Sequence, residues 1–543
     1  MKTFTEMPPF VISFIQKQHM FWVATAPLSA DGHVNLSPKG LSGTFHIKDE
    51  NTVWYEDMTG SGVETIAHLR ENGRMTIMFC AFEGPPQIVR LHGRGKVYEY
   101  DSSEYNKLIP LNERQPGSRS VIMLHIHRVG TSCGFSVPFY TFKGDRMRLH
   151  QYCAKSERAD LAAADASQPS LNGLATSFPD EIADNGVRRY WAVLNKTSID
   201  GLPGIQDAHK SKTLFDRDIA NKEWKQESLS RAAHQQHSQH QTLGVTTWVD
   251  PKLFVALRYV NNMGKTFDEI PAFVVPWIQK QRMFWVATAP LSKTGHVNVS
   301  PKGFAGTFHI VDQKTVWYED MTGSGIETVS HLRENGRMTI MFCAFEGPPQ
   351  IVRLFGHGKV FEFDTPEYNE LVPLDKRQPG SRSVIVLDIH RVGTSCGYSI
   401  PFYSFKAERM RLHQFFANKE MADIEAEVNA TKIGEDQDDS KGEQPRYPVT
   451  ENGVKNYWLV RNKESIDGLP GIQTAYKSGT TFDRRISSKE WKQQNTFMDA
   501  LRAKLMPYIT NWIDPKLLSG VALGVAVSVL WNSLTKGSGR IMV

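Results

Sequence analysis

Cysteine is scarce in this chain, which has five among its 543 residues. No two of them stand at the C-x-x-C spacing of zinc sites and redox motifs. The sequence also lacks a Walker loop, a Rossmann glycine fingerprint and a nucleophile elbow. These absences argue against a bound metal, a disulfide framework and the commonest hydrolase sites. They fit a reducing compartment.

Blocks of one charge sign are also missing, and the net charge is only +5. Without a cluster of lysines and arginines, we expect no nucleic-acid partner. The segment Met1–Pro9 has no basic-then-apolar signal layout. We therefore expect a cytoplasmic protein.

One uncharged run stands out at residues 517–535. Its length is at the lower limit for a helix that spans a bilayer. Gly520, Gly524 and Ser528 follow at four-residue spacing, as in close-packed membrane helices. The run is either a membrane anchor or a C-terminal helix buried against the domains.

The chain contains a long internal repeat, because residues 10–150 and 273–413 align without a gap. His68–Leu91 recurs letter for letter at His331–Leu354. A repeat this long is a duplicated domain and no solenoid unit. We predict a first unit at 1–225, a linker at 226–265, a second unit at 266–516 and an apolar tail at 517–543. A fused duplicate carries its dimer partner in the same chain.

Each unit has the pattern of a mostly antiparallel β-barrel decorated with helices. Short apolar, β-prone runs alternate with turn residues over 21–127. A helix is predicted at 63–71 between the strands. Residues 87–93 and 95–100 read as two strands joined at a glycine bend. Residues 154–184 match their counterparts poorly and suggest a loose helix or surface insertion.

The strongest local motif is Thr59–Thr65, with its twin Thr322–Thr328. Glycines let a ligand approach the backbone, and a helix N-terminus suits a phosphate. Ser61 and Glu64 stand at capping-box spacing, so a cap without a ligand is the alternative.

A second motif, Asn35–Gly40, puts a hydroxyl and an ammonium group two residues apart, potentially on one strand face. Lys39 could meet a phosphate or a polarised carbonyl, or it could be a solvated strand-end lysine. Gln87 and Arg90 could reach the edge of a planar polar ligand, although a surface arginine is the commoner case. The Ser-Ile-Asp-Gly-Leu-Pro-Gly segments at 198–204 and 465–471 have no assigned role.

The order of these motifs resembles the pyridoxamine 5'-phosphate oxidase-like, FMN-binding split-barrel family. The resemblance rests on the Asn35–Gly40 hairpin, the Val53–Asp57 strand, the helix, Glu71–Phe79 and Gln87–Gly93. It implies an α+β, mainly β fold: two tandem split β-barrels with helical decorations that form an intrachain pseudo-dimer. FMN would lie between the barrels, with residues of both in contact.

Carried over position by position, the resemblance implies a set of flavin-binding residues in each unit. In the first unit they are Ser37, Lys39, Tyr55, Gly60, Ser61, Gly62, Thr65 and Gln87. In the second they are Ser300, Lys302, Tyr318, Gly323, Ser324, Gly325, Thr328 and Gln350.

The chain departs from the oxidases of this family at the phosphate segment. They have Ser-Arg-Lys where this chain has Val63-Glu64-Thr65, so two cations are replaced. This departure argues against pyridoxamine phosphate as the substrate. The prediction is an FMN-dependent oxidoreductase with an unknown small-molecule substrate. The alternative is a non-catalytic ligand-binding or scaffold protein tethered to a membrane by its tail. A deazaflavin or haem ligand is a third option.

Overall fold

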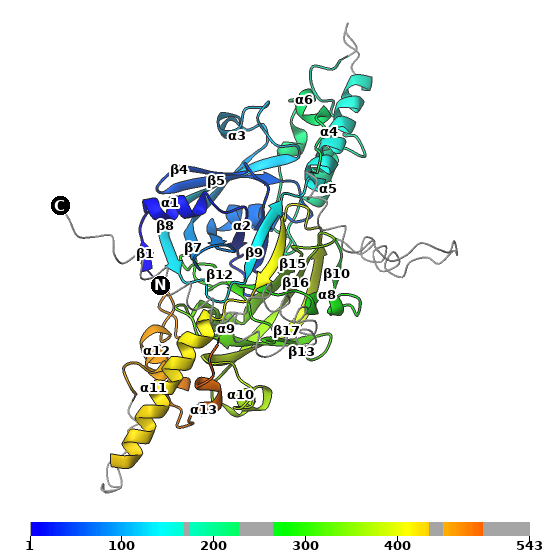
Figure 1. Ribbon diagram of the computed structural model, residues 1–543. Coiled ribbons are helices and arrows are strands. Elements are labelled where there is room, and N and C mark those ends of the chain that lie inside the picture. The colour runs from blue at the N-terminus through cyan, green and yellow to red at the C-terminus, as the bar shows by residue number, and fades with distance from the viewer. Residues whose placement is uncertain (1, 168–173, 227–263, 434–448, 492–543) are drawn as a thin grey trace, which may run out of the picture. The chain divides into compact units, whose positions relative to one another are not determined.

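The computed structural model of the chain describes residues 2–167, 174–226, 264–433 and 449–491. These residues lie in one compact unit, Met1–Lys492. They form two eight-stranded sheets, one from each copy of the repeat, and a two-stranded sheet that joins the copies. Figure 1 shows the blue and cyan strands of the first half beside the green and yellow strands of the second.

The two halves have the same order of elements. The first half contains β1 (Lys2–Phe4), α1 (Pro9–Ile15), β2 (Phe21–Thr25), β3 (Asn35–Lys39), β4 (Phe45–Asp49), β5 (Thr52–Met58), α2 (Glu64–Glu71), β6 (Arg74–Cys80), β7 (Ile88–Glu99), α3 (Ser103–Leu108), β8 (Ser118–Ser132), β9 (Phe139–Gly144), α4 (Arg148–Ser167), α5 (Val187–Leu194), η1 (Ala208–Lys210) and α6 (Arg217–Asn221). The second half contains β10 (Thr266–Phe267), α8 (Val275–Gln279), β11 (Phe284–Thr288), β12 (Asn298–Lys302), β13 (Phe308–Ile310), β14 (Thr315–Met321), α9 (Glu327–Asn335), β15 (Arg337–Cys343), β16 (Ile351–Glu362), α10 (Pro366–Leu371), β17 (Ser381–Ser395), β18 (Phe402–Ala407), α11 (Arg411–Ile433), α12 (Val454–Arg461), η4 (Ala475–Lys477) and α13 (Arg484–Ser487).

Each large sheet is antiparallel. Seven strands run in the order β3-β2-β6-β7-β8-β5-β4, or β12-β11-β15-β16-β17-β14-β13 in the second half. The eighth strand, β1 or β10, pairs with β8 or β17. Successive side chains of a strand point to opposite faces of the sheet. Both faces of the central strands β2 and β6 are covered, so all their residues are buried. Phe21 and Val23 of β2 join the core of their own half. Trp22 and Ala24 point the other way, into a core shared by both halves.

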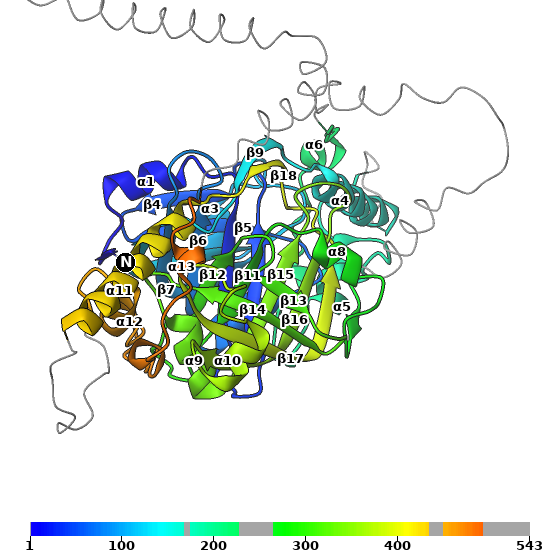
Figure 2. The ribbon, with the colours of Figure 1, turned by 60° about the horizontal axis from the view of Figure 1, so that its bottom comes forward.

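We call this shared core, with the polar contacts around it, the seam. At the seam Trp22 stacks on Trp285 with ring centroids 5.0 Å apart and an interplanar angle of 23°. β9 of the first half pairs with β18 of the second, and both lie side by side in Figure 2. The two halves therefore share one apolar core, in addition to the core that each half has of its own.

Four buried arginines reach across the seam. Arg74 donates to the carbonyls of Pro290 and Ser292, and its twin Arg337 to those of Pro27 and Ser29. Similarly, Arg146 and Arg409 each bond three carbonyls of the opposite half. A guanidinium group has five donors in a fixed plane, so it can satisfy several carbonyls of a loop at once.

The fold prediction is confirmed: the chain is a tandem pair of split barrels that forms an intrachain pseudo-dimer. One strand prediction is wrong, because residues 88–99 form the single strand β7. Gly93 lies within this strand, at a register shift against β8. A Cβ at Gly93 would lie 2.1 Å from the carbonyl oxygen of His125, so glycine permits the close approach of the two strands.

Of the two alternatives for residues 154–184, a loose helix or a surface insertion, the structure shows a helix over 154–167, which belong to α4 and have a buried face. Among the described residues, no helix is both long and apolar enough to cross a bilayer. The predicted anchor at 517–535 lies outside the described residues, as does most of the predicted linker. The predicted domain boundaries stay predictions.

Replacing Trp22 by alanine tests the seam. Loss of a fully buried tryptophan side chain should lower the free energy of unfolding by about 3–5 kcal/mol. Chemical denaturation measures the loss, and Phe10→Ala is the control because Phe10 is 53% exposed. A Trp22→Ala loss no larger than that of the control would contradict the shared core.

Candidate functional site

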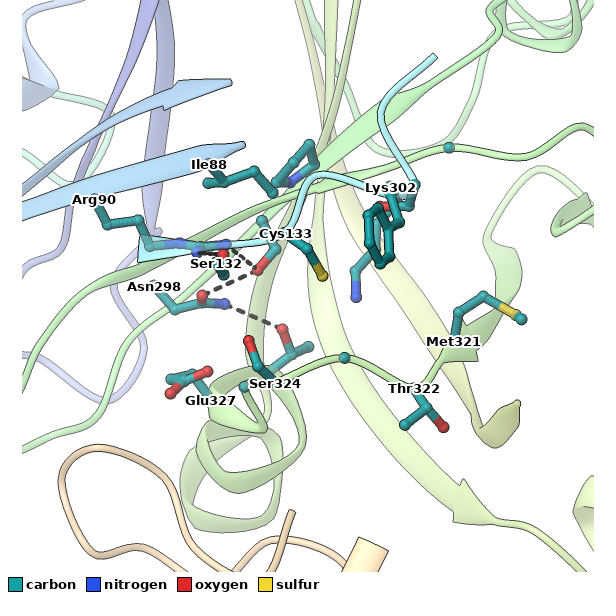
Figure 3. Close-up of a pocket in the computed structure, with 18 of the residues that line it drawn as sticks. Ile88, Arg90, Ser132, Cys133, Asn298, Lys302, Met321, Thr322, Ser324 and Glu327 are labelled. Carbon is teal, nitrogen blue, oxygen red and sulfur yellow. Dashed lines mark hydrogen bonds between the residues drawn. The ribbon is translucent and has the colours of Figure 1, made fainter. Parts of the chain in front are cut away.

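Two cavities lie at the seam, one for each half, and each is walled by both halves. The first pocket has a volume of about 360 Å³ and combines β3, the end of β5 and the start of α2 with β16 and β17. The second pocket, of about 110 Å³, combines the equivalent elements of the second half with β7 and β8. Figure 3 shows Lys302, Ser324 and Cys133 pointing into the second pocket, which Arg90 reaches from the first half.

The Ser-Pro-Lys-Gly strand ends lie directly against the opposite half. A Cβ at Gly40 would be 2.1 Å from the carbonyl oxygen of Ser399. A Cβ at Gly303 would be 1.9 Å from that of Ser136. Glycine is therefore required at the last position of this motif, because the backbone of the other half occupies the space of a side chain.

Most of the predicted site residues line these pockets. The first pocket includes Ser37, Lys39, Tyr55, Gly60, Ser61, Gly62 and Thr65. The second includes Ser300, Lys302, Gly323, Ser324, Gly325 and Thr328. The structure does not bring Gln87, Gln350 or Tyr318 to the surface of either pocket.

Lys39 is held by a carboxylate that it shares with an arginine. Its Nζ lies 2.8 Å from Oδ1 of Asp57, and Nε of Arg119 lies 2.8 Å from Oδ2 of the same carboxylate. Burial alone would raise the pKa of Asp57, but the Arg119 and Lys39 cations hold it below its ordinary value. Asp57 is therefore ionised at neutral pH and fixes the position of both cations.

The twin cluster in the second half has the same geometry. Lys302 and Arg382 lie 2.7 and 2.8 Å from the two oxygens of Asp320. Burial opposes ionisation here too, yet the two cations lower the pKa of Asp320 to about 2. Sequence reasoning identified the lysines of these clusters but missed the aspartates and arginines.

The helix after the glycine loop begins without a side-chain cap. Its N-cap is Val63, which makes no capping hydrogen bond, so the predicted Ser61–Glu64 capping box is wrong. The Glu64 carboxylate instead folds back on the loop, and a Cβ at Gly62 would lie 2.3 Å from its Oε2. Glu327 does the same at Gly325. A carboxylate at a helix N-terminus stabilises the helix dipole.

The glycine loop is held by hydrogen bonds from α5 and from Asn195, the residue that follows this helix. Nδ2 of Asn195 donates to the carbonyl of Gly60 over 2.9 Å. Nε1 of Trp191 donates to Oγ1 of Thr59 over 2.8 Å. A Cβ at Gly204 would press on Val63, so the end of the Ser-Ile-Asp-Gly-Leu-Pro-Gly segment packs on the start of α2.

Each pocket also contains a half-buried arginine from the opposite half. Nε of Arg353 donates to the carbonyl of Leu36 over 2.7 Å, and Nε of Arg90 donates to that of Val299 over 2.8 Å. The sequence suggests Arg90 as a possible ligand contact. It gives no sign that Arg90 lines the pocket of the second half.

A buried carboxyl lies in each pocket wall. Burial raises the pKa of Glu56 to about 7, although a hydrogen bond from the Gln115 N–H acts in the opposite direction. Burial also raises the pKa of its twin, Glu319, to about 7. The folded protein thus holds these protons more tightly than the unfolded chain. Their contribution to stability is full below pH ~4 and is lost as pH rises to about 7.

Glu56→Gln combined with Glu319→Gln should remove part of this pH dependence. Relative to the variant, the wild-type free energy of unfolding should fall by up to roughly 3 kcal/mol per site between pH 5 and 8. Urea denaturation over this range measures it, with exposed Glu113→Gln as the control. Parallel pH curves for wild type and variant would contradict the assignment.

Comparison with known proteins identifies similar chains. A family model described as "Pyridoxamine 5'-phosphate oxidase" matches residues 7–133 and 270–396. The "Pyridoxamine 5'-phosphate oxidase family protein ustO" of Aspergillus flavus is 35% identical over 209 residues, which is 38% of this chain and 77% of that protein.

Solved structures resemble smaller parts of the chain. HupZ of Group A Streptococcus is 21% identical and has a TM-score of 0.20, with coverage of 23% of this chain and 92% of that one. The FAD binding protein of Mycobacterium smegmatis is 10% identical and has a TM-score of 0.18, with coverage of 23% and 96%.

Proposed function

This chain belongs to the pyridoxamine 5'-phosphate oxidase family, and we propose that it binds FMN in both seam pockets for redox chemistry on a small molecule. The observation that carries this proposal is the composition of each pocket. A lysine and a glycine loop of one half face a half-buried arginine of the other half. Neither half has a complete pocket alone.

The charges of the first pocket suit a phosphorylated ligand. The cations around it are Lys39, Arg119, Lys265, Arg353 and Arg391, and the acidic groups are Asp57, Glu64 and Glu56, whose pKa of about 7 leaves it partly protonated at neutral pH. The net positive charge favours an anion, and charge-assisted hydrogen bonds to phosphate are among the stronger ones in proteins. These cations take the place of the two that the Val63-Glu64-Thr65 segment lacks.

The loop also leaves room for a ligand to approach. A Cβ at Gly60 would meet only the carbonyl oxygen of Met58, at 4.0 Å, and one at Gly323 would meet nothing within 4 Å. The buried Oη of Tyr55, which lines the first pocket, has no hydrogen-bond partner among the described residues. A ligand that offers an acceptor or donor would satisfy it.

FMN, when bound, supplies the hydride and electron transfer that no side chain of this pocket supplies. The protein then has to hold the flavin, exclude water and balance charge. Lys39, kept in place by Asp57, is suited to stabilise negative charge on a bound flavin. Burial raises the pKa of the pocket thiols Cys133 and Cys396, so neither is a ready thiolate nucleophile at neutral pH.

The arginines that cross the seam give a test of shared pockets. The wild-type protein should bind two FMN per chain and be yellow when loaded. Arg353→Gln should weaken only the first pocket and Arg90→Gln only the second, since each serves the other half's pocket. Each variant should then bind one FMN tightly, with the second site at least tenfold weaker.

Titration of FMN fluorescence gives the stoichiometry, and exposed Arg189→Gln is the control because its side chain is 53% exposed. A wild-type protein that stays colourless and binds no added FMN would sink the proposal. FMN that binds but is turned over by no reductant would favour the non-catalytic alternative.

The glycine-loop carboxylates should oppose phosphate binding. Glu64 lies against Gly62 at the start of α2, where a phosphate would also be stabilised. Glu64→Gln with Glu327→Gln should therefore tighten FMN binding by about five- to tenfold and leave riboflavin binding nearly unchanged. Parallel titrations with both flavins measure it. Equal effects on both would show that the carboxylates do not face the phosphate.

A further inference from the structure

A buried chain of polar side chains leads from the Ser-Ile-Asp-Gly segment to the first pocket. Asp200 of this segment accepts hydrogen bonds from the backbone N–H of His33 (2.9 Å) and from its Nδ1 (2.5 Å). The other ring nitrogen of His33 lies 3.0 Å from Nε2 of His390, on the opposite half. Asp200 is thus held firmly at the seam.

The second step of the chain is His68, which is fully buried in α2. Its Nδ1 lies 3.0 Å from Oγ1 of Thr25, whereas its Nε2 lies 4.0 Å from Oδ2 of Asp200 and has no hydrogen-bond partner among the described residues. Burial lowers the pKa of His68 to about 4 despite the nearby Asp200. The ring is therefore neutral at pH 7 and carries one proton, on one of these two nitrogens.

The last step joins Thr25 to the pocket through Asn35. Nδ2 of Asn35 lies 3.1 Å from Oγ1 of Thr25 and 3.0 Å from Oγ1 of Thr65. Oγ of Ser37 lies 3.1 Å from Oδ1 of Asn35. Asn35 is thus the branch point between the buried chain and two hydroxyls of the predicted site, Thr65 and Ser37.

The second half repeats the hydrogen bonds of this arrangement. Asp467 binds His296, which contacts His127 of the first half. The twin bonds are His331–Thr288 (3.0 Å), Asn298–Thr288 (3.2 Å), Asn298–Thr328 (3.1 Å) and Ser300–Asn298 (3.2 Å). The network therefore occurs in both copies of the duplicated domain.

The direction of every bond in this chain follows from the position of one proton. The Asp200 carboxylate near Nε2 of His68 favours the proton on that nitrogen. Nδ1 then accepts from the Thr25 hydroxyl, so Thr25 must accept from Nδ2 of Asn35. The second proton of that amide goes to Thr65, whose own hydroxyl proton has no acceptor among the described residues.

We propose that Asn35 and Asn298 are positioning residues that set the hydrogen-bond polarity of each pocket. Thr65 and Thr328 then offer an O–H donor to the ligand, and Ser37 and Ser300 offer acceptor lone pairs. In the second pocket Nη2 of Arg90 lies 3.4 Å from Oγ of Ser300, as an accepting hydroxyl requires.

The inference rests on the proposed flavin site and specifies its ligand further. The preferred ligand presents a hydrogen-bond acceptor to Thr65 and a donor to Ser37. The first Ser-Ile-Asp-Gly segment gains a role as well, because the negative charge of Asp200, 4.0 Å from Nε2 of His68, favours the proton on that nitrogen. If the Asn35 amide were turned over, every bond would reverse and Nδ1 of His68 would carry the proton.

The tautomer of His68 in the ligand-free full-length protein tests the polarity directly. Nitrogen-15 NMR of histidine-labelled protein separates protonated from unprotonated ring nitrogens, and a His68→Gln variant assigns the signal. The expected state is protonated Nε2 and unprotonated Nδ1. A proton on Nδ1 would overturn the proposal, whatever the protein does with FMN.

Binding of FMN tests the consequence for the ligand. Thr65→Val with Thr328→Val should weaken FMN binding about tenfold, since one donor is lost. Serine at both positions should restore most of this loss. Asn35→Asp with Asn298→Asp should weaken binding by more than this, because a carboxylate would capture the threonine proton and also add a negative charge to the pocket.

Combining the valine and aspartate changes should then cost less than the sum of the two separate losses, because the threonine donor can be lost only once. Additive losses in the combined variant would overturn the proposal, because they would mean that Asn35 acts without Thr65. A wild-type protein that binds no FMN would instead overturn the proposed function, and the His68 tautomer would still decide the polarity.

Discussion

The contact between the two halves is the constraint on which the rest of the structure depends. The side chains of β2 and β11 point alternately into the core of their own half and into the shared core. Each half alone would therefore expose the apolar face that it contributes to the shared core. The arginines that bond carbonyls of the opposite half fix the register of this contact. Because both pockets are lined from both sides, the seam determines the pockets as well as the fold.

Within each pocket, charge is organised around one buried carboxylate. Asp57 and Asp320 each hold a lysine and an arginine, and they keep their own charge because these two cations outweigh the cost of burial. A buried ion pair contributes little net stability, and its value lies more in specifying one arrangement. Here the arrangement places a lysine ammonium group at the edge of a cavity that also receives an arginine from the other half.

Local patterns and contiguous motifs predicted much of this molecule. The repeat, the β2–β3 hairpin, the helix after the glycine loop and Lys39 all follow from residues close together in sequence. The predicted glycine bend was wrong because Gly93 lies inside β7, where it permits the close approach of β8. The predicted capping box was wrong because Glu64 turns back onto Gly62.

The missing parts of the site come from distant segments. Asp200 and His33 are 167 residues apart, and Arg353 and Leu36 are 317 apart. No periodicity or spacing relates such residues, since only the closed seam brings them together. A duplicated sequence predicts that the halves meet, but it does not predict which arginine fills the partner's pocket or which amide orients its hydroxyls.

A crystal structure of the full chain grown with FMN tests the central claim most directly. The account predicts flavin density at the seam, in contact with Ser37 and Lys39 of the first half and with Arg353 of the second. Flavin bound wholly within one half, or at a surface away from both pockets, would contradict it.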